Sequence, residues 1–232
     1  MTAAAYLTQA ARTIQSVVDT QEPAIRAAGE AVARALVEGH RLWTFGTGHS
    51  HLLAEEVYHR AGGLDGVRAV LEPSLMLHEG AGKSSTLERL PGLAAALLSQ
   101  HDVGAGDVVL VASNSGRNSV PVEFAEECVA RGAVVVAVTS LDHSRSVASR
   151  APSGRRLFEV ADIVVDNCGV PGDAVLDVPG VDQRVGPTST MTGALIVQAI
   201  VCEAVSLMVE LGHSPEVLRS ANSDPSAGDS AP

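Results

Sequence analysis

The sequence has few aromatic residues and few cysteines, and both shortages limit what the protein can be. Phe, Trp and Tyr make up only 3% of the 232 residues. Ala, Val and Leu must therefore build the core, which favours tightly packed α/β layers. The three cysteines, Cys128, Cys168 and Cys202, are far apart and odd in number. This pattern argues against a disulfide framework and against a thiolate zinc site, and we interpret the cysteines as small core residues.

Basic residues are also scarce. The chain has 16 Lys and Arg against 27 Asp and Glu, which gives a formal net charge of −11. Nucleic-acid-binding proteins normally show a basic patch, and the densest basic segment here, residues 145–156, has no interleaved aromatic residues. We therefore expect no nucleic-acid partner, and a soluble protein whose anion site is local.

Targeting and membrane signals are missing from the sequence as well. The N-terminal segment has no charged region followed by a continuous apolar stretch, so we expect no signal peptide. Residues 193–212 are long and apolar, but they include Gln198, Glu203 and Glu210. A buried core or interface helix explains this segment better than a membrane span. We expect a cytoplasmic protein without a membrane partner.

Short, Val-rich apolar runs alternate with helical patterns along the chain. We predict strands at 41–47, 67–72, 107–113, 133–140 and 162–167. We predict helices at 2–39 (one or two, with Pro23 near a helix start), 49–63, 87–100 (interrupted around Pro91), 120–132 and 189–211. Continuous apolar strands separated by helices indicate an α/β fold with a five-stranded parallel sheet flanked by helices. The expected organisation is an N-terminal helical segment at 1–40, one α/β domain at 41–212 and a disordered Ser/Pro/Asp-rich tail at 213–232.

Ligands in such folds bind where the carboxyl ends of the strands meet the following loops. After the third strand, residues 113–119 read SNSGRNS and lead into a helix. Ser113, Ser115 and Ser119 supply hydroxyl groups, Gly116 permits close backbone approach, and a helix N-terminus offers free N–H groups to an anion. The segment predicts a phosphate cradle without a lysine; the alternative is a well-capped turn.

Two other glycine-containing segments do not complete a nucleotide motif. FGTGHS at 45–50 follows the first strand, but His51 stands where a dinucleotide fingerprint requires its third glycine. EGAGKSS at 79–85 contains a G-K-S, but Leu77 occupies the position of the first glycine of a P-loop. We therefore expect no nucleotide hydrolysis.

GTGHS after the first strand and SNSGRNS after the third resemble the sugar isomerase (SIS) domain, whose phosphate loop reads S-x-S-G-x-x-S. PTSTMTGAL at 187–195 resembles the start of the final SIS helix in arabinose-5-phosphate isomerases. The resemblance runs from about residue 25 to 212 and is nearest to phosphoheptose-isomerase-like members and an uncharacterised bacterial branch. It implies a three-layer sandwich, a homodimer or homotetramer with sites near subunit interfaces, and a sugar phosphate ligand. The binding residues that it implies are Gly46, Thr47, Gly48, Ser50, Ser113, Asn114, Ser115, Gly116, Ser119, Ser189 and Thr190.

Aldose–ketose isomerisation needs a base that moves a proton between adjacent carbons, and an acid assists ring opening. On the helix after GTGHS, Glu56 and His59 are neighbours at helical spacing. After the second strand, His78 and Glu79 occupy a loop that often supplies a Glu and a His in SIS isomerases. These four are the candidate catalytic residues, with Glu55 as a further one. A solvated charged face is the alternative interpretation of the helix.

The chain departs from phosphoheptose isomerases at its final helix. Those enzymes carry a Gln and a later His there, whereas this helix offers Gln198, Cys202 and Glu203, which puts heptose-phosphate chemistry in doubt. The set His49, His51, Glu55 and His59 could attract zinc, but zinc needs three or four converging ligands. We predict no cofactor and no metal.

The sequence thus predicts a phosphosugar-binding SIS protein that acts as a sugar-phosphate aldose–ketose isomerase. Two alternatives share the same phosphate loop. One is a phosphosugar sensor without chemistry, and the other is a lyase or etherase acting on an amino-sugar phosphate.

Overall fold

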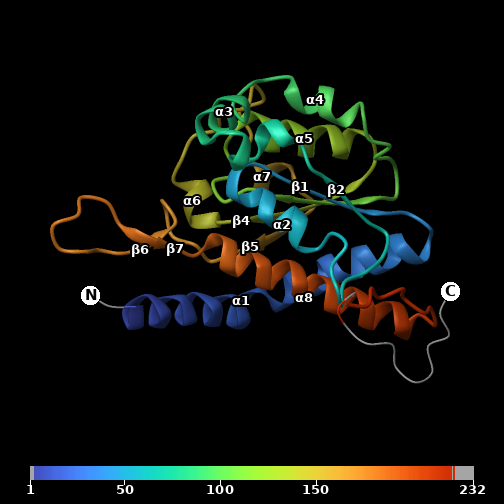
Figure 1. Ribbon diagram of the computed structural model, residues 1–232. Coiled ribbons are helices and arrows are strands. Elements are labelled where there is room, and N and C mark those ends of the chain that lie inside the picture. Colours follow the sequence, from blue (N-terminus) through green and yellow to red (C-terminus); the bar gives the residue numbers. More distant parts are fainter. Residues whose placement is uncertain (1–2, 221, 223–232) are drawn as a thin grey trace.

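The structure is a computed structural model that describes residues 3–220 and 222. Its centre is a five-stranded parallel sheet with the order β2-β1-β3-β4-β5 (Figure 1). The strands are β1 Leu42–Gly46, β2 Val67–Val70, β3 Val108–Ala112, β4 Val134–Thr139 and β5 Ile163–Asp166. Each lies inside its predicted range, so the α/β fold with five parallel strands is confirmed.

Helices cover both faces of the sheet. They are α1 Ala3–Val37, α2 His51–Glu56, α3 Ala81–Leu87, α4 Leu93–Leu98, α5 Ser119–Ala130, α6 Leu141–Arg145, α7 Leu157–Val160 and α8 Ser189–Glu210. Short 3-10 turns lie at Gly48–Ser50, Pro73–Leu75 and Leu77–Glu79. In Figure 1, α1 and α8 lie side by side below the sheet, and α4 and α5 lie above it.

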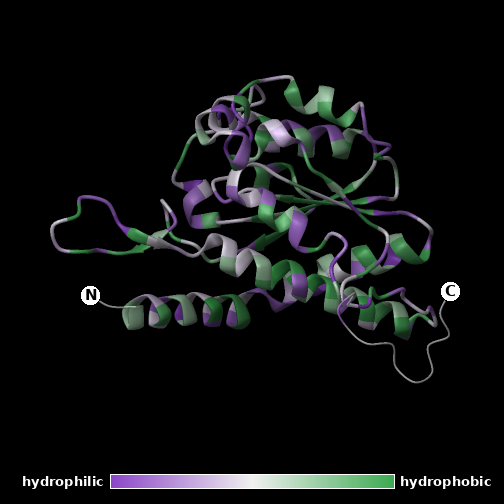
Figure 2. Cartoon of the chain, viewed as in Figure 1, coloured by the Kyte–Doolittle hydropathy of each residue, from purple (hydrophilic) through white to green (hydrophobic). Residues whose placement is uncertain are grey.

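The alternation of strand side chains builds two separate cores. Leu110 of β3 packs on the side of α1 and α8, whereas its neighbours Val109 and Val111 pack on the side of α4 and α5. Phe45 and Phe124 stack on that second side with ring centroids 3.9 Å apart. Because the central strand β3 is buried on both faces, it is hydrophobic at every position, and Figure 2 shows hydrophobic residues along the sheet.

α1, which we predicted as one or two helices, is a single helix, whereas α2 and α4 are shorter than the predicted 49–63 and 87–100. α1 continues through Pro23 as one helix, although a proline inside a helix lacks the N–H for its hydrogen bond. α2 ends at Glu56 instead of continuing to residue 63, because His59 adopts a φ of +46°, which no right-handed helix accommodates.

A hairpin that the sequence did not predict joins β5 to α8. Its strands are β6 Ala174–Leu176 and β7 Val185–Pro187, which pair antiparallel. The hairpin projects beside the N-terminal end of α1 (Figure 1), and the Tyr6 hydroxyl donates to the Pro187 carbonyl at 2.8 Å. This contact joins the beginning of the chain to the hairpin.

The chain beyond α8 turns back toward the loop after α2. Leu218 N–H donates to the Gly63 carbonyl at 2.9 Å, and Asp65 N–H donates to the Glu216 carbonyl at 2.9 Å. Residues 213–220, which we assigned to the tail, are thus seated on the body of the protein. Residues 221 and 223–232, where we also predicted disorder, lie outside the described residues.

α8 is the one helix among the described residues that is long and apolar enough to cross a bilayer. Its buried residues, which include Ile196, Val197 and Ile200, pack in the core between the sheet and α1. This agrees with the prediction that residues 193–212 form a buried core or interface helix.

Candidate functional site

The candidate site lies at the point where the strand order of the sheet changes direction, between β1 and β3. β1 pairs with β2 on one side and with β3 on the other, so the loops after β1 and β3 leave the same sheet edge next to each other. This switch point is where open α/β sheets bind ligands. The two segments that we selected from the sequence, GTGHS and SNSGRNS, meet there.

A cavity of about 300 Å³ opens between these loops. Its lining residues are Thr47, Gly48, His49, Ser50, Leu77, Ser84, Ser85, Glu88, Ser113, Asn114, Ser115, Asn118 and His143. The lining is polar, with hydroxyl, amide, carboxylate and imidazole groups. Such a lining suits a hydroxylated, anionic ligand better than an apolar one.

The loop after β3 is a tight turn of fixed shape. Gly116 has a φ of +58°, and a Cβ there would lie 2.8 Å from Ser144 Oγ. Its N–H donates to Ser113 Oγ at 3.2 Å. Ser115 and Asn114 line the cavity, whereas Ser119 is fully buried and donates to the Arg150 carbonyl at 2.9 Å. Of the three serines predicted to bind phosphate, Ser113 and Ser115 line the cavity. Ser119 instead holds the loop in place through its hydrogen bond to the Arg150 carbonyl.

The loop after β1 is held to the rest of the site by Thr47. Gly46 starts this loop, and a Cβ there would lie 2.3 Å from the Ser50 carbonyl oxygen, so only glycine fits the turn. Thr47 Oγ1 donates to Glu88 Oε2 at 2.9 Å. The predicted residues Thr47, Gly48 and Ser50 line the cavity, while Gly46 shapes the turn beneath it.

Glu88 lines the cavity with a carboxylate and is not among the residues predicted from the sequence. It follows α3 directly and accepts a second hydrogen bond at Oε1 from Asn118 Nδ2 at 2.8 Å. Its carbonyl also accepts from Val120 N–H at 3.0 Å. Glu88 therefore ties the loop after β1 to the loop after β3. Nothing in the local sequence around residue 88 indicates this position.

His143 brings an imidazole to the same cavity from α6, just after β4. Its Nδ1 is buried and has no hydrogen-bond partner among the described residues. Burial lowers the pKa of His143, Arg117 lowers it further, and Asp173 opposes the shift. The ring is therefore neutral near pH 7. His143 follows the carboxyl end of β4, where ligands bind in such folds, and this position in the sequence could have indicated the residue.

The catalytic residues that we predicted lie elsewhere. Glu56 accepts hydrogen bonds from Gln198 at 3.1 Å and from Arg60 at 3.0 Å. His59 is exposed beyond the end of α2. Among the described residues that line the cavity, neither of them appears.

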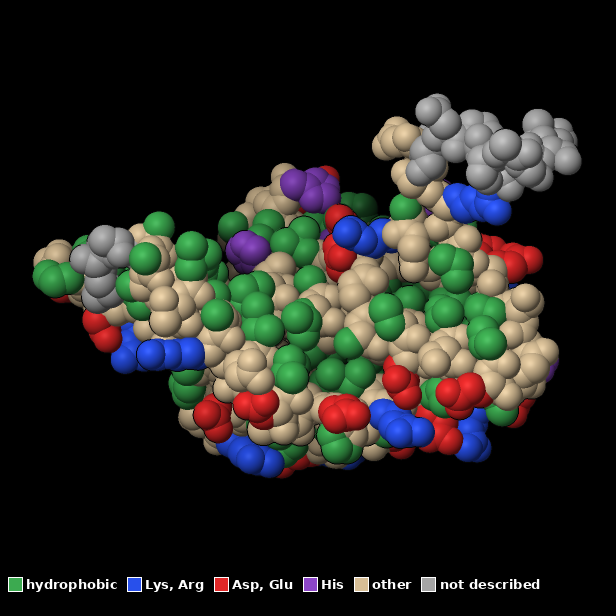
Figure 3. All heavy atoms as spheres, turned by 90° about the horizontal axis from the view of Figure 1, so that it is seen from below, with side chains coloured by type: hydrophobic (Ala, Val, Ile, Leu, Met, Phe, Trp, Pro, Cys, Tyr) green, Lys and Arg blue, Asp and Glu red, His purple; other side chains and the backbone are tan. Residues whose placement is uncertain are grey.

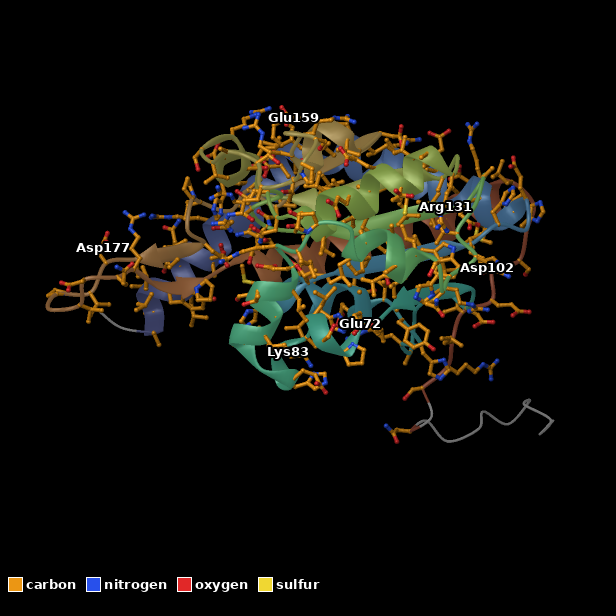
Figure 4. All side chains as sticks on the ribbon, turned by 90° about the horizontal axis from the view of Figure 1, so that it is seen from above. Glu72, Lys83, Asp102, Arg131, Glu159 and Asp177 are labelled. Carbon is orange, nitrogen blue, oxygen red and sulfur yellow. The ribbon has the colours of Figure 1, made fainter. Side chains whose placement is uncertain are left out.

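His78 and Glu79 are exposed next to the cavity residue Leu77. Glu79 forms a 3.0 Å ion pair with Lys83, and its hydrogen bond to that ammonium lowers the pKa of Glu79. Figure 4 shows Lys83 on α3 at the periphery of the molecule. The structure thus places His78 and Glu79 outside the cavity, next to its lining residue Leu77.

Ser189 and Thr190, at the start of α8, line a small pocket that they share with Ser50 and Asn114. Asp173 accepts from the Ser189 N–H at 2.8 Å and from its hydroxyl at 2.6 Å. The structure therefore brings the start of α8 beside both loops.

The histidines of the possible zinc set do not converge. His51 is buried, and its Nε2 lies 3.0 Å from Glu55 Oε1, but the contact lacks hydrogen-bond geometry and both ring nitrogens are without a partner in the described chain. Burial lowers the pKa of His51 and outweighs the nearby Glu55 carboxylate. Within residues 3–220 and 222, no group of three His, Cys, Asp or Glu side chains is placed to hold a metal ion.

Residues 5–140 match the SIS domain family. A UPF0309 protein of Halalkalibacterium halodurans is 46% identical over 213 residues, which cover 92% of this chain and 88% of that protein. This likeness and the family match confirm the resemblance that the two loops predicted.

Solved structures show the same fold at low sequence identity. The phosphoheptose isomerase of Neisseria gonorrhoeae superposes with a TM-score of 0.60 at 16% identity, covering 87% of this chain and 96% of that one. The Vibrio vulnificus NanR protein complexed with ManNAc-6P superposes with a TM-score of 0.53 at 19% identity, covering 90% of this chain and 63% of that one. Both an isomerase and a ligand-bound protein of another kind therefore share this architecture.

Proposed function

This chain belongs to the SIS domain family, with UPF0309 proteins among its relatives, and we propose that it is a sugar-phosphate aldose–ketose isomerase. The observation that carries the proposal is the Glu88 carboxylate, which lies in a polar cavity and is hydrogen-bonded to both glycine-containing loops. A base fixed between a phosphate loop and a sugar-binding loop is what the reaction requires.

The phosphate binds, in this proposal, at the loop after β3. Ser113 and Ser115 supply hydroxyl groups there, and the 12-residue helix α5 begins directly after this loop. The positive end of such a helix dipole favours an anion nearby. The sugar then extends toward Thr47, Gly48 and Ser50 on the other side of the cavity.

Glu88 moves the proton between the two carbons. It removes the proton from C2 of the open-chain aldose, which gives an enediol, and it returns the proton to C1 to form the ketose. The neutral His143 accepts the proton of the C2 hydroxyl and delivers a proton to the C1 oxygen, so that charge does not accumulate. The carboxylate accepts hydrogen bonds at both oxygens, which fixes its orientation in the cavity.

Glu56, His59, His78 and Glu79 form a second set of candidates for acid–base catalysis. In a single chain they lie outside the cavity lining, so they would need a neighbouring subunit or a loop movement to reach the sugar. Comparing Glu88→Gln with Glu56→Gln and Glu79→Gln separates the two sets.

The test of the proposal is a thermal-shift screen against pentose, hexose, heptose and amino-sugar phosphates, repeated with Ser115→Ala. A ligand at 100 times its dissociation constant stabilises the folded state by about 2.7 kcal/mol. Ser16→Ala on α1 is the matched control, since its hydroxyl only donates to the Arg12 carbonyl on an exposed helix face. A shift lost in Ser115→Ala and kept in Ser16→Ala supports the phosphate loop, whereas no shift with any sugar phosphate contradicts the proposal.

Turnover then separates isomerisation from its alternatives. Interconversion of an aldose phosphate and a ketose phosphate, followed by NMR, supports the isomerase. Binding without turnover favours a sensor, and release of lactate from N-acetylmuramic acid 6-phosphate favours an etherase.

We also propose that the protein is cytoplasmic and assembles as a homodimer or homotetramer through the outer face of α1 and α8. Leu7, Val18 and Val209 are 66%, 58% and 59% exposed on these helices, and Figure 3 shows hydrophobic side chains spread over this underside. A groove of about 420 Å³ between the two helices has a largely apolar lining that includes Ile25 and Leu195. An apolar surface of this kind on an otherwise acidic protein is typical of an interface.

A further inference from the structure

Asn118 connects Glu88 to a residue outside the cavity lining. Its Nδ2 donates to Glu88 Oε1 at 2.8 Å, and its Oδ1 accepts from Arg150 Nη1 at 2.7 Å. Asn118 is buried and lines the cavity, whereas Arg150 is exposed and does not belong to the lining. A single buried amide therefore joins the proposed base to a guanidinium group beyond the cavity.

The chemistry of Arg150 fixes the direction of these two hydrogen bonds. A guanidinium group has donors and no acceptor, so the Asn118 atom that faces it has to be the carbonyl oxygen. The NH₂ group of the same amide then points to Glu88, where it can only donate. Arg150 thereby selects which end of the Asn118 side chain meets the carboxylate.

The backbone of Arg150 is attached to the loop after β3 on both sides of Asn118. Its N–H donates to the Arg117 carbonyl at 2.7 Å, and its carbonyl accepts from Ser119 Oγ at 2.9 Å. The guanidinium group thus extends from a fixed point beside Asn118. Because these contacts use only backbone atoms of Arg150, they are retained when its side chain is replaced.

We propose that Arg150 is a positioning residue for proton abstraction, because it turns the Asn118 amide so that Glu88 meets a donor at Oε1. The inference rests on the proposed function, in which Glu88 is the base. Thr47 donates to the other carboxylate oxygen at 2.9 Å, but a hydroxyl group can also turn and accept, so Thr47 suits either protonation state. A fixed NH₂ group suits only the ionised carboxylate, which is the form that acts as a base.

The removal of Arg150 frees the Asn118 amide to turn. Its Oδ1 can then accept a hydrogen bond from a protonated Glu88, so the inactive form of the base gains a partner that it lacks in the wild type. The chain Arg150–Asn118–Glu88, which we call the relay, therefore predicts that a change outside the cavity alters the protonation of a carboxylate inside it.

The test is a titration of the Glu88 carboxyl group in the protein without ligand, followed by NMR of ¹³C-labelled glutamate; Glu88→Gln identifies the signal. We expect Arg150→Gln to move the midpoint to higher pH by about half a pH unit or more, because glutamine can accept as well as donate. Arg150→Lys keeps both the charge and a donor, so it should stay closer to the wild type. Arg34→Gln on α1, which removes a charge paired with Glu30, is the matched control and should leave the midpoint unchanged.

A double-mutant cycle separates the relay from a direct effect of the positive charge of Arg150. In Asn118→Leu the amide is absent, so the relay predicts that adding Arg150→Gln moves the midpoint no further, whereas a direct charge effect persists. The Asn118 side chain makes no capping hydrogen bond to α5, so its replacement leaves the helix start in place. Other charged or titratable groups near Glu88 are the same in all four proteins, so their influence cancels: His49, His143 and Arg89.

Turnover shows whether the relay serves the reaction. The pH profile of kcat/KM reports groups of the free enzyme, so its acid limb should move in Arg150→Gln by the same amount as the NMR midpoint. It is measured with the pentose, hexose and heptose phosphates of the thermal-shift screen. A residue with a merely structural role lowers the rate without moving this limb.

Each outcome has a separate meaning. An unchanged midpoint in Arg150→Gln overturns the inference. A shift that persists in full in the Asn118→Leu background overturns the relay and assigns the effect to the charge alone. Absence of turnover in the wild type contradicts the proposed function, and the titration still decides whether Arg150 controls Glu88 through Asn118.

Discussion

Replacing Glu88 by glutamine separates the chemistry of the site from its structure. Glu88 accepts one hydrogen bond from Asn118 Nδ2 at 2.8 Å and another from Thr47 Oγ1 at 2.9 Å. A glutamine side chain has nearly the same shape. Its oxygen can accept from Asn118, and its NH₂ group can donate to the Thr47 hydroxyl, which can turn and accept. Both contacts survive, so we expect the free energy of unfolding to change by less than about 1 kcal/mol.

The effect on turnover is expected to be far larger. An amide cannot remove a proton from carbon, and a positioned base contributes about 10²- to 10⁴-fold to the rate. This corresponds to about 3–5 kcal/mol in the activation barrier. The binding of the sugar phosphate, measured by thermal shift, is expected to persist.

The assay is NMR-detected interconversion of the sugar phosphate pair found in the ligand screen. Asp177→Asn is the matched control, because this exposed carboxylate only forms an ion pair with Arg184 on the hairpin, and such pairs contribute about 0–1 kcal/mol. If Glu88→Gln retains turnover within threefold of the wild type, the assignment of Glu88 as the base is wrong.

Further predictions concern stability and the shape of the loop. Burial lowers the folded-state pKa of His51 and His143 below their usual 6.5, so the unfolded chain binds more protons between the folded pKa and 6.5. The contribution of these two histidines to the free energy of unfolding is therefore fully present above about pH 6.5 and is lost as the pH falls through this window. A melting temperature that is unchanged from pH 7.5 to 5 would contradict this. Gly116→Ala places a side chain in the left-handed region, which costs about 1–2 kcal/mol, and brings its Cβ within 2.8 Å of Ser144 Oγ; urea unfolding should show at least this loss, and an unchanged midpoint would count against the tight turn. Asp107→Ala leaves three N–H donors without their acceptor, at about 1–3 kcal/mol each, so unfolding should become easier by several kcal/mol while the phosphate loop still binds its ligand once folded.

The sheet could be predicted because its strands are buried on both faces. A strand such as 108–112, VVLVA, must be apolar at every position, and glycines or polar residues mark its ends. The hairpin at 174–187 could not be predicted in this way, since its three-residue strands are only partly buried. α2 was overestimated because the helical pattern continues to residue 63, whereas the backbone turns at His59.

The two loops that line the cavity could be located because the local backbone requires glycine at Gly46 and Gly116. The proposed acid–base groups could not, because Glu88 and His143 reach the cavity from segments that are distant in the sequence. A carboxylate after a helix looks the same in the sequence whether it faces solvent or a cavity. Conversely, Glu79 stands in a loop where a catalytic residue is expected, and the structure pairs it with Lys83.

The position of the site between β1 and β3 has a consequence for how the protein folds. The two loops are separated by more than 60 residues of chain, and they meet only after β3 has paired with β1 in register. Contacts between residues so far apart form slowly during folding. The ligand therefore recognises only chains whose central strands are already assembled, and a sugar phosphate supplied during refolding should raise the yield of native protein by capturing that arrangement.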